Sequence, residues 1–181
     1  MKVQRHHISD FLKVEDSFVP MGTGFNSLNE SPNSQVDTKT YINEKSASST
    51  VKGYQTEFSF DSDLITDEKA IMKLYEVGRN QLTGTDAEAE YLRIDLFSEY
   101  EKSGPEGTLT KVPGTYKARL FNVTIQVDSN EGAGGENVKV SGILKGNGTP
   151  IFGGATLVKD ESTGKITGAT FKSDAEFSNE Q

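Results

Sequence analysis

The most regular alternation of apolar and polar positions lies between residues 116 and 128. The apolar positions are Phe121, Val123, Ile125 and Val127. The polar positions between them are Asn122, Thr124, Gln126 and Asp128. Side chains alternate between the two faces of a β-strand, so a period of two indicates one buried face and one open face. The sequence therefore predicts a half-buried strand over 116–128.

A second alternation runs from residue 54 to residue 60. Its core-facing positions are Tyr54, Thr56, Phe58 and Phe60, and its polar positions are Gln55, Glu57 and Ser59. Shorter patterns predict strands over 92–96 and 137–144, and a hairpin that joins 155–158 to 165–171. A turn-rich stretch is expected over 98–114. The short glycine-rich links between these strands favour antiparallel pairing.

A single amphipathic helix is predicted over 67–78. Thr66 is a suitable N-cap, and Asp67 and Glu68 place negative charge on the first turn. The apolar stripe with helical spacing is Ala70, Ile71, Leu74, Tyr75 and Gly78. One helix among six or seven strands predicts a mainly β fold, an antiparallel β-sandwich or partly open barrel with one flanking α-helix.

The first 53 residues show no sustained period. Residues 1–16 indicate an N-terminal arm, and 17–53 a long loop with ten Ser or Thr between positions 23 and 50. The loop also carries spaced large apolar residues: Phe18, Met21, Phe25, Leu28, Tyr41 and Ile42. Two interpretations remain open, a flexible linker and a segment that a partner subunit orders. The sandwich then occupies 54–158, and a C-terminal hairpin and tail occupy 159–181.

The composition argues against several classes of protein. The chain has no cysteine, and its two histidines, His6 and His7, both lie in the N-terminal arm, which makes a Ser-His-Asp triad implausible. No phosphate-binding loop or converging set of metal ligands is evident. No apolar run has the length of a membrane span, and the N-terminus lacks the apolar core of a secretory signal. We expect no catalytic residues, no cofactor and no metal, and predict that the chain is not an enzyme.

The charge is negative and unevenly distributed. The net charge is −8, and the stretch 82–107 holds seven carboxylates and two cations. Stable binding to nucleic acid needs cationic side chains that displace phosphate counterions, so this balance disfavours it. An acidic surface can still face DNA if its task is to avoid adhesion.

Several segments are informative through their order and spacing. They are Phe25-Asn-Ser-Leu-Asn-Glu-Ser-Pro-Asn33, Tyr41-Ile-Asn-Glu-Lys45, 59–79, 84–96, 116–123 and Val138-Lys-Val-Ser-Gly142. Together they resemble the major tail proteins, or tail tube proteins, of tailed bacteriophages. The resemblance covers roughly residues 15–158, and 159–181 extends past the point where the family usually closes.

The resemblance implies a structural virion protein. Six copies would form a ring with one continuous inner β-barrel, and stacked rings would form the tail tube through which DNA is ejected. It also implies assembly in the host cytoplasm and location in the virion tail. The implied partners are other copies of the chain, the tape measure protein, the tail terminator, the baseplate or tail-tip proteins, passing DNA without specific binding, and a sheath protein if the tail contracts.

Two surfaces would then carry the function. The candidate lumen-facing residues are the polar strand positions Gln55, Glu57, Ser59, Asn122, Thr124, Gln126 and Asp128. The candidate inter-ring contacts are the apolar loop residues Phe18, Met21, Phe25, Leu28, Tyr41 and Ile42. Deletion of 23–50 is expected to leave a folded domain that cannot stack. The alternative function is a non-catalytic carbohydrate- or receptor-binding module of a phage tail, which exposed aromatic residues on a groove would favour.

Overall fold

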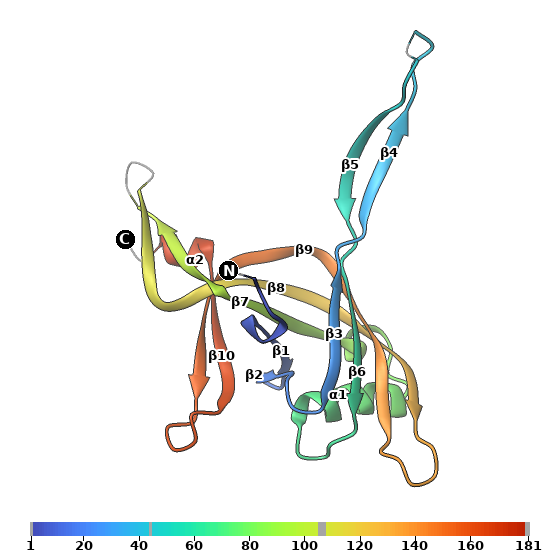
Figure 1. The fold of residues 1–181 in the computed structure, drawn as a ribbon, viewed down its shortest axis with the longest axis vertical. Helices are drawn as coiled ribbons and strands as arrows, with labels where there is room; N and C mark the ends of the chain where they lie inside the picture. The colour runs from blue at the N-terminus through green and yellow to red at the C-terminus, as the bar shows by residue number, and fades with distance from the viewer. Residues whose placement is uncertain (1, 44, 105–107, 180–181) are drawn as a thin grey trace.

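The protein forms one large antiparallel sheet with a projecting hairpin (Figure 1), and the computed structural model describes residues 2–43, 45–104 and 108–179. The eight strands of the large sheet lie in the order β10-β2-β1-β7-β8-β9-β6-β3. Their bounds are β1 Ile8–Val14, β2 Ser17–Pro20, β3 Phe25–Ser31, β6 Glu57–Asp63, β7 Glu88–Ser103, β8 Leu109–Glu131, β9 Lys139–Lys159 and β10 Ile166–Ser173. The hairpin is a separate sheet of β4 Ser34–Lys39 and β5 Ser48–Tyr54.

Three long strands, β7, β8 and β9, run through the whole body and bend the sheet on itself. The first part of β9 pairs with β6 (Lys139 to Lys145), and its last part pairs with β10 (Gly153 to Lys159). Strand β10 also pairs with β2, through Ala169 and Phe18. The strands β10, β2, β1, β7, β8 and β9 therefore follow one another in a partly closed ring. The prediction of a mainly β, antiparallel fold with one main helix is confirmed, and the large sheet is partly ring-like.

The bent sheet buries a core on each of its faces. One core lies under the helix and includes Phe58, Tyr91, Phe121 and Val123. The other lies on the opposite face under β10 and includes Phe11, Leu92, Ile94 and Ala155. Neighbouring residues such as Tyr91 and Leu92 therefore enter different cores. This explains why four consecutive residues of β7, from 91 to 94, are all buried.

The main helix, α1, spans Lys69–Arg79, close to the predicted 67–78. Its buried side chains are Ala70, Ile71, Leu74 and Val77. The N-cap is Glu68, which makes no side-chain capping bond, so the prediction of Thr66 as N-cap is wrong. Gly78 lies against β8, and a Cβ there would come within 2.8 Å of Cγ1 of Val127. The glycine thus permits close packing of the helix on the sheet.

The N-terminal third departs from its prediction. Strand β1 lies in the middle of the large sheet between β2 and β7, although residues 1–16 indicated an arm. Only the short 3₁₀ turn η1, Arg5–His7, precedes it. The predicted loop 17–53 also contains β2 and β3, which belong to the same sheet, and the hairpin β4–β5. The prediction of a single loop without regular structure over 17–53 is therefore wrong.

The C-terminal extension completes the second core. The predicted hairpin between β9 and β10 is confirmed, and Asp160 organises its turn by accepting hydrogen bonds from the backbone N–H groups of Ser162 and Thr163 at 3.0 and 2.8 Å. A short helix, α2 Asp174–Ser178, was not predicted. Its Phe177 stacks on Tyr100 with ring centroids 4.5 Å apart, and the Tyr100 hydroxyl donates to Asp174 at 2.7 Å.

Strands also extend into the stretch predicted as turns, since β7 continues to Ser103 and β8 begins at Leu109. A second 3₁₀ turn, η2 Gly84–Ala87, leads into β7. In the described part of the chain, no helix has both the length and the apolar character needed to span a membrane.

Candidate assembly surfaces

One face of the sheet is polar across five strands, β7, β8, β9, β6 and β3, and we call it the polar face. Residues directly opposite each other in antiparallel strands point to the same side, so register defines its rows. One row joins Gln126, Ile143, Ser59 and Asn29. The next row joins Glu88, Thr124, Lys145, Glu57 and Ser31. A third joins Glu90, Asn122 and Asn147.

The structure therefore brings most of the candidate lumen residues together. Glu57, Ser59, Asn122, Thr124 and Gln126 share the polar face. Asp128 joins them, since it accepts a hydrogen bond of 2.6 Å from Nε2 of Gln126. Gln55 does not lie in β6, because it falls between β5 and β6 at the root of the hairpin. Whether this face lines a lumen stays a prediction.

Carboxylates outnumber cations on the polar face. Its acidic side chains are Glu57, Asp61, Glu88, Glu90 and Asp128. Its basic side chains include Lys145, whose Nζ lies 3.8 Å from Glu57, Lys13, which pairs with Glu90, and Lys139, which lies opposite Asp63 and Glu131. Small amides and hydroxyls fill the space between them; Asn147, for instance, donates to Oγ1 of Thr124 at 2.8 Å. The face is hydrophilic, mildly negative and without an aromatic residue among these positions.

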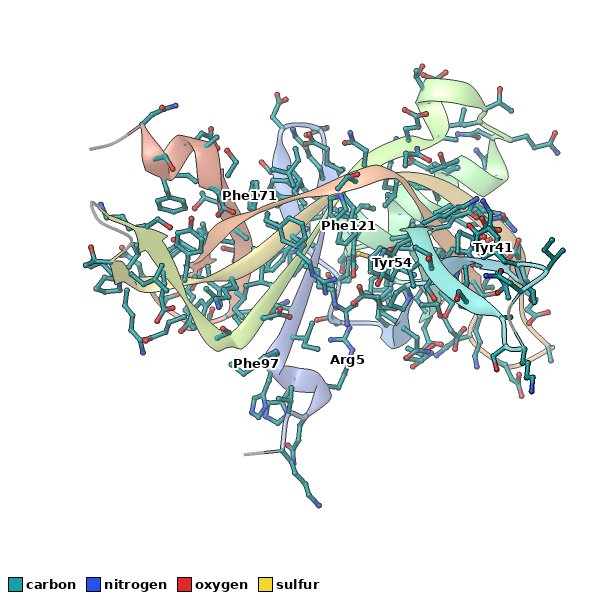
Figure 2. All side chains as sticks on the ribbon, turned by 90° about the horizontal axis from the view of Figure 1, so that it is seen from above. Arg5, Tyr41, Tyr54, Phe97, Phe121 and Phe171 are labelled. Carbon is teal, nitrogen blue, oxygen red and sulfur yellow. The ribbon has the colours of Figure 1, made fainter. Side chains whose placement is uncertain are left out.

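The hairpin β4–β5 projects from the body, and its strands pair only with each other (Figure 1). Its exposed large apolar residues are Val36, Tyr41, Ile42, Val51 and Tyr54. Figure 2 labels Tyr41 and Tyr54 on this extension. A two-stranded hairpin without a packed face is marginally stable at best in water. The segment therefore needs a surface that the monomer does not supply.

The two faces of the hairpin differ in chemistry. Val36 lies opposite Val51, and Thr38 lies opposite Ser49, with their hydroxyl oxygens 3.0 Å apart. The other face carries Asp37, whose carboxylate lies 2.8 Å from Nζ of Lys52. The hairpin thus has an apolar and hydroxyl-bearing face and a charged face.

The root of the hairpin is closed by hydrogen bonds. The backbone N–H of Gln55 donates to the carbonyl of Asn33 at 3.1 Å, and Nδ2 of Asn33 donates back to the carbonyl of Gln55 at 3.2 Å. Asn33 has φ of +47°, a left-handed conformation that Asn adopts more readily than most residues. These bonds direct the hairpin away from β3 and β6.

The candidate inter-ring residues divide between the body and the hairpin. Met21 and Leu28 are 4% and 3% exposed and belong to the core under α1. Phe25 packs partly against that core, and Phe18 against the other. For Met21 and Leu28 the prediction is wrong, because their side chains are buried inside the body. For Phe18 and Phe25, which are half-buried, it stays a prediction. Only Tyr41 and Ile42 lie in the projecting segment and are exposed.

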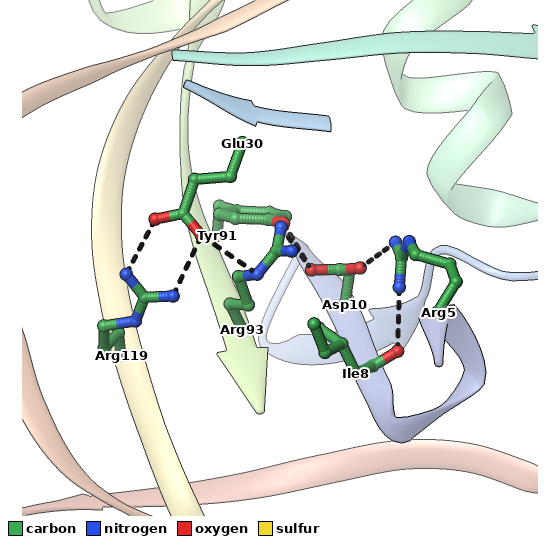
Figure 3. Close-up of polar contacts among 7 residues, drawn as sticks. All are labelled: Arg5, Ile8, Asp10, Glu30, Tyr91, Arg93 and Arg119. Carbon is green, nitrogen blue, oxygen red and sulfur yellow. Dashed lines mark hydrogen bonds and ion pairs between the residues drawn. The ribbon is translucent and has the colours of Figure 1, made fainter. Parts of the chain in front are cut away.

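Sequence reasoning missed a buried charge network that joins four strands (Figure 3). Arg119 on β8 makes a bidentate pair with Glu30 on β3, at 2.7 and 3.0 Å. Arg93 on β7 lies between two carboxylates, with Nε 3.3 Å from Glu30 and Nη1 3.5 Å from Asp10 on β1. Arg5 and the hydroxyl of Tyr91 also bond to Asp10. No periodic signal could have found these pairs, because their members lie far apart in the chain.

Burial and close partners shift the pKa values of Tyr91 and Arg93 in this network. Burial, with the nearby Asp10, raises the pKa of Tyr91 well above its ordinary value, so the hydroxyl stays protonated and donates. Burial opposes the charge on Arg93, but Tyr91, Asp10 and Glu30 outweigh it and raise its pKa. Nε of Arg93 is buried without a hydrogen bond, although it lies within ion-pair distance of Glu30. The network has a structural role, because arginines pair with both carboxylates and so link strands β1, β3, β7 and β8.

Comparison with known proteins gives little further information. No family model matches the chain, and no curated protein matches it. One solved structure with a detectable likeness is described as the anti-feeding prophage baseplate, 6-fold symmetrised, with 6% sequence identity and a TM-score of 0.43. The likeness covers 80% of this chain and 89% of that chain. At this identity and TM-score it does not bear on what the chain does.

Proposed function

We propose that this chain is a non-enzymatic, self-assembling structural protein of a phage tail, and specifically the subunit of its tail tube. The tail tube is named as the specific assembly because segments within 15–158 resemble tail tube proteins. Two surfaces of the molecule support the proposal independently of that resemblance: the projecting hairpin supports self-assembly, and the polar face supports a channel wall.

The hairpin is the observation that carries the proposal. Val36, Tyr41, Ile42 and Val51 are exposed on a two-stranded element that pairs with nothing else in the described chain. Apolar burial contributes about 25 cal/mol per Å², so covering such side chains on a partner is favourable. A projecting element that docks on a different patch of the next copy gives a head-to-tail contact, which propagates into rings or filaments.

The polar face supports a role as the wall of a channel. A wall that DNA slides past must offer hydrogen-bonding groups to water without cationic clusters that hold phosphate. The face has small amides and hydroxyls and more carboxylates than lysines, as Glu57, Glu88 and Asp128 illustrate. In the proposed assembly, six copies arrange this face around a lumen and the net charge of −8 limits adhesion of DNA.

The proposed assembly also defines location and partners. The subunit would assemble in the host cytoplasm and reside in the virion tail, between tail terminator and baseplate or tail-tip proteins, around the tape measure protein. A sheath protein would surround the tube if the tail contracts. None of these roles requires a catalytic residue, a cofactor or a metal.

Cryo-electron microscopy of the purified, assembled protein tests the proposal. We expect stacked rings of six subunits around an open channel, with Glu57, Thr124 and Gln126 on its wall. Assemblies without a channel, or a channel lined by a different surface, would overturn the tail tube assignment. Clear binding in a glycan array by a protein that stays monomeric would favour the alternative binding module.

A further inference from the structure

A cleft of about 830 Å³ lies beside β3, between it and the β1 region. One wall is β3 from Phe25 to Asn29, and the other is formed by Arg5 and the start of β1. Apolar side chains, among them Phe11 and Met21, contribute to its lining. The cleft therefore follows β3, and its lining combines apolar side chains with polar ones such as Arg5 and Asn26.

Strand β3 presents an unpaired edge to this cleft. It is the last strand of the sheet, and among the described residues it pairs only with β6. It contains neither lysine nor proline, two residues that commonly protect exposed strand edges, although it has a register shift between Phe25 and Ser27 and an inward-pointing charge at Glu30. A terminal strand offers the backbone N–H and C=O groups of its free edge to a further strand.

The opposite wall does not offer such an edge. The carbonyl of Ile8 accepts from Nη1 of Arg5 at 2.9 Å, and the carbonyl of Asp10 accepts from the N–H of Met21 at 2.8 Å. A strand that enters the cleft would therefore pair with β3.

The hairpin has the two faces that this position requires. Along β3, Leu28 points into the core, whereas Asn29 and Ser31 lie on the polar face. A strand added to this edge would continue both surfaces. The Val36 and Val51 face fits the apolar side, and the face with Asp37 and Lys52 fits the polar side.

The chain's own hairpin does not occupy the cleft. The paired Asn33 and Gln55 close its root, and it continues away from β3 in Figure 1. An occupant with the same sequence must therefore come from a second copy. Because donor hairpin and acceptor edge are different surfaces, each copy can donate to one neighbour and accept from another.

We propose that the hairpin β4–β5 of a second copy adds to the free edge of β3, with Val36 and Val51 turned toward the cleft. This inference rests on the proposed self-assembly and names the contact through which it occurs. The charge network holds the acceptor in place, because Arg119 and Arg93 fix Glu30, one residue beyond Asn29, from inside the body.

Disulfide cross-linking tests this contact cleanly, since the chain has no cysteine. Asn29→Cys is placed in one protein, and Ser48→Cys, Thr50→Cys or Lys52→Cys, which scan the charged face, in a second protein of different tag length. The two are mixed and oxidised mildly. With at least one of the three, we expect the mixed dimer to exceed the control by about tenfold or more, because docked groups meet at effective concentrations of roughly millimolar.

The control pairs Asn29→Cys with Ser162→Cys, an exposed position in the β9–β10 turn. Circular dichroism of each variant checks that these surface changes leave the fold intact. The inference is overturned if none of the three hairpin variants gives more mixed dimer with Asn29→Cys than the control pair does. Dominant cross-linking of Asn29→Cys to itself also overturns it, because that result means β3 pairs with β3.

Electron microscopy of the same samples separates the two proposals. Rings or tubes without the specific cross-link reject the hairpin-to-β3 contact and leave the tail tube proposal standing. The specific cross-link in assemblies that are neither rings nor tubes supports the contact and rejects the tube. Absence of both the cross-link and any assembly rejects both.

Discussion

Strands β6 and β5 follow each other in the chain and have seven residues each, yet they differ completely in environment. In β6, Phe58, Phe60 and Ser62 are buried beneath the polar face. In β5, no residue is buried, and Val51 is exposed. Both strands are antiparallel and hydrogen bonded, so backbone pairing is common to the two. The difference shows that β6 derives its stability from the monomer, whereas β5 has its side chains available for another molecule.

The largest effect should follow from removing a side chain of the body. Phe58 is fully buried and contacts the rings of Tyr91 and Phe121 at centroid distances of 4.4 and 4.9 Å. We expect Phe58→Ala to lower the free energy of unfolding by about 3–5 kcal/mol. Urea denaturation measures this change. The matched change in the hairpin, Val51→Ala, should alter the free energy of unfolding by no more than about 0.5 kcal/mol. Equal losses in the two variants would contradict the contrast between β6 and β5.

The buried charge network extends the contrast to ion pairs. Arg93→Met removes the cation between Asp10 and Glu30, and we expect a loss of about 3 kcal/mol, the lower end for a broken buried pair, because Arg5 and Arg119 remain. Thermal and urea unfolding both report it. Lys111→Met removes an exposed pair of 2.9 Å with Glu99 and should cost no more than about 1 kcal/mol. A similar loss in both variants would show that burial does not set the strength of these pairs.

Changes on the apolar face of the hairpin should affect assembly instead of folding. The double variant Val36→Ser with Val51→Ser should unfold within about 0.5 kcal/mol of the parent, because both side chains are exposed in the monomer. Sedimentation velocity should show that it no longer forms large assemblies. Val138→Ser, at another exposed valine, is the control and should assemble normally. Normal assembly of the double variant would show that the apolar face of the hairpin is not needed for contact between subunits.

The smallest effect concerns an exposed turn that the monomer does organise. Hydrogen bonds from Ser162 and Thr163 lower the pKa of Asp160 from 3.8 to about 2. Since the folded pKa lies below the unfolded one, the stabilisation is present above about pH 4 and is lost as the pH falls toward 2. Carboxyl titration by NMR should give a midpoint near 2. Asp160→Asn should remove this acid dependence at the β9–β10 turn, and a midpoint near 4 in the parent would contradict the account.

The sequence was most informative where one face of an element is buried. The alternation of Phe121, Val123 and Ile125 with polar neighbours located β8, and the same logic located β6 and the polar face. The helical stripe with Ile71 and Leu74 located α1 to within two residues. In these elements a single core enforces a single period.

The same logic failed where both faces or neither face are buried. In β1, Phe11 enters one core and Leu12 the other, so no alternation remains and the strand resembled an irregular arm. In β4 and β5 almost every side chain is exposed, so no pattern marks the hairpin. The charge network depends on tertiary contacts between Asp10 and Glu30 through Arg93, which local sequence does not encode.

The structure also changes which deletion is expected to abolish assembly and leave the fold intact. Removal of 23–50 would delete β3, with its buried Leu28 and the Glu30 of the charge network. Removal of 34–54 takes out the hairpin alone. Because Asn33 and Gln55 are hydrogen bonded to each other, a Gly-Gly turn can join them without strain on β3 or β6.

Negative-stain electron microscopy of the parent and of this hairpin-deleted variant, at equal concentration, tests the central claim most directly. We predict stacked rings or tubes for the parent, and dispersed particles with an unchanged unfolding midpoint for the variant. Tubes formed by the folded variant would contradict the claim that the hairpin joins the subunits.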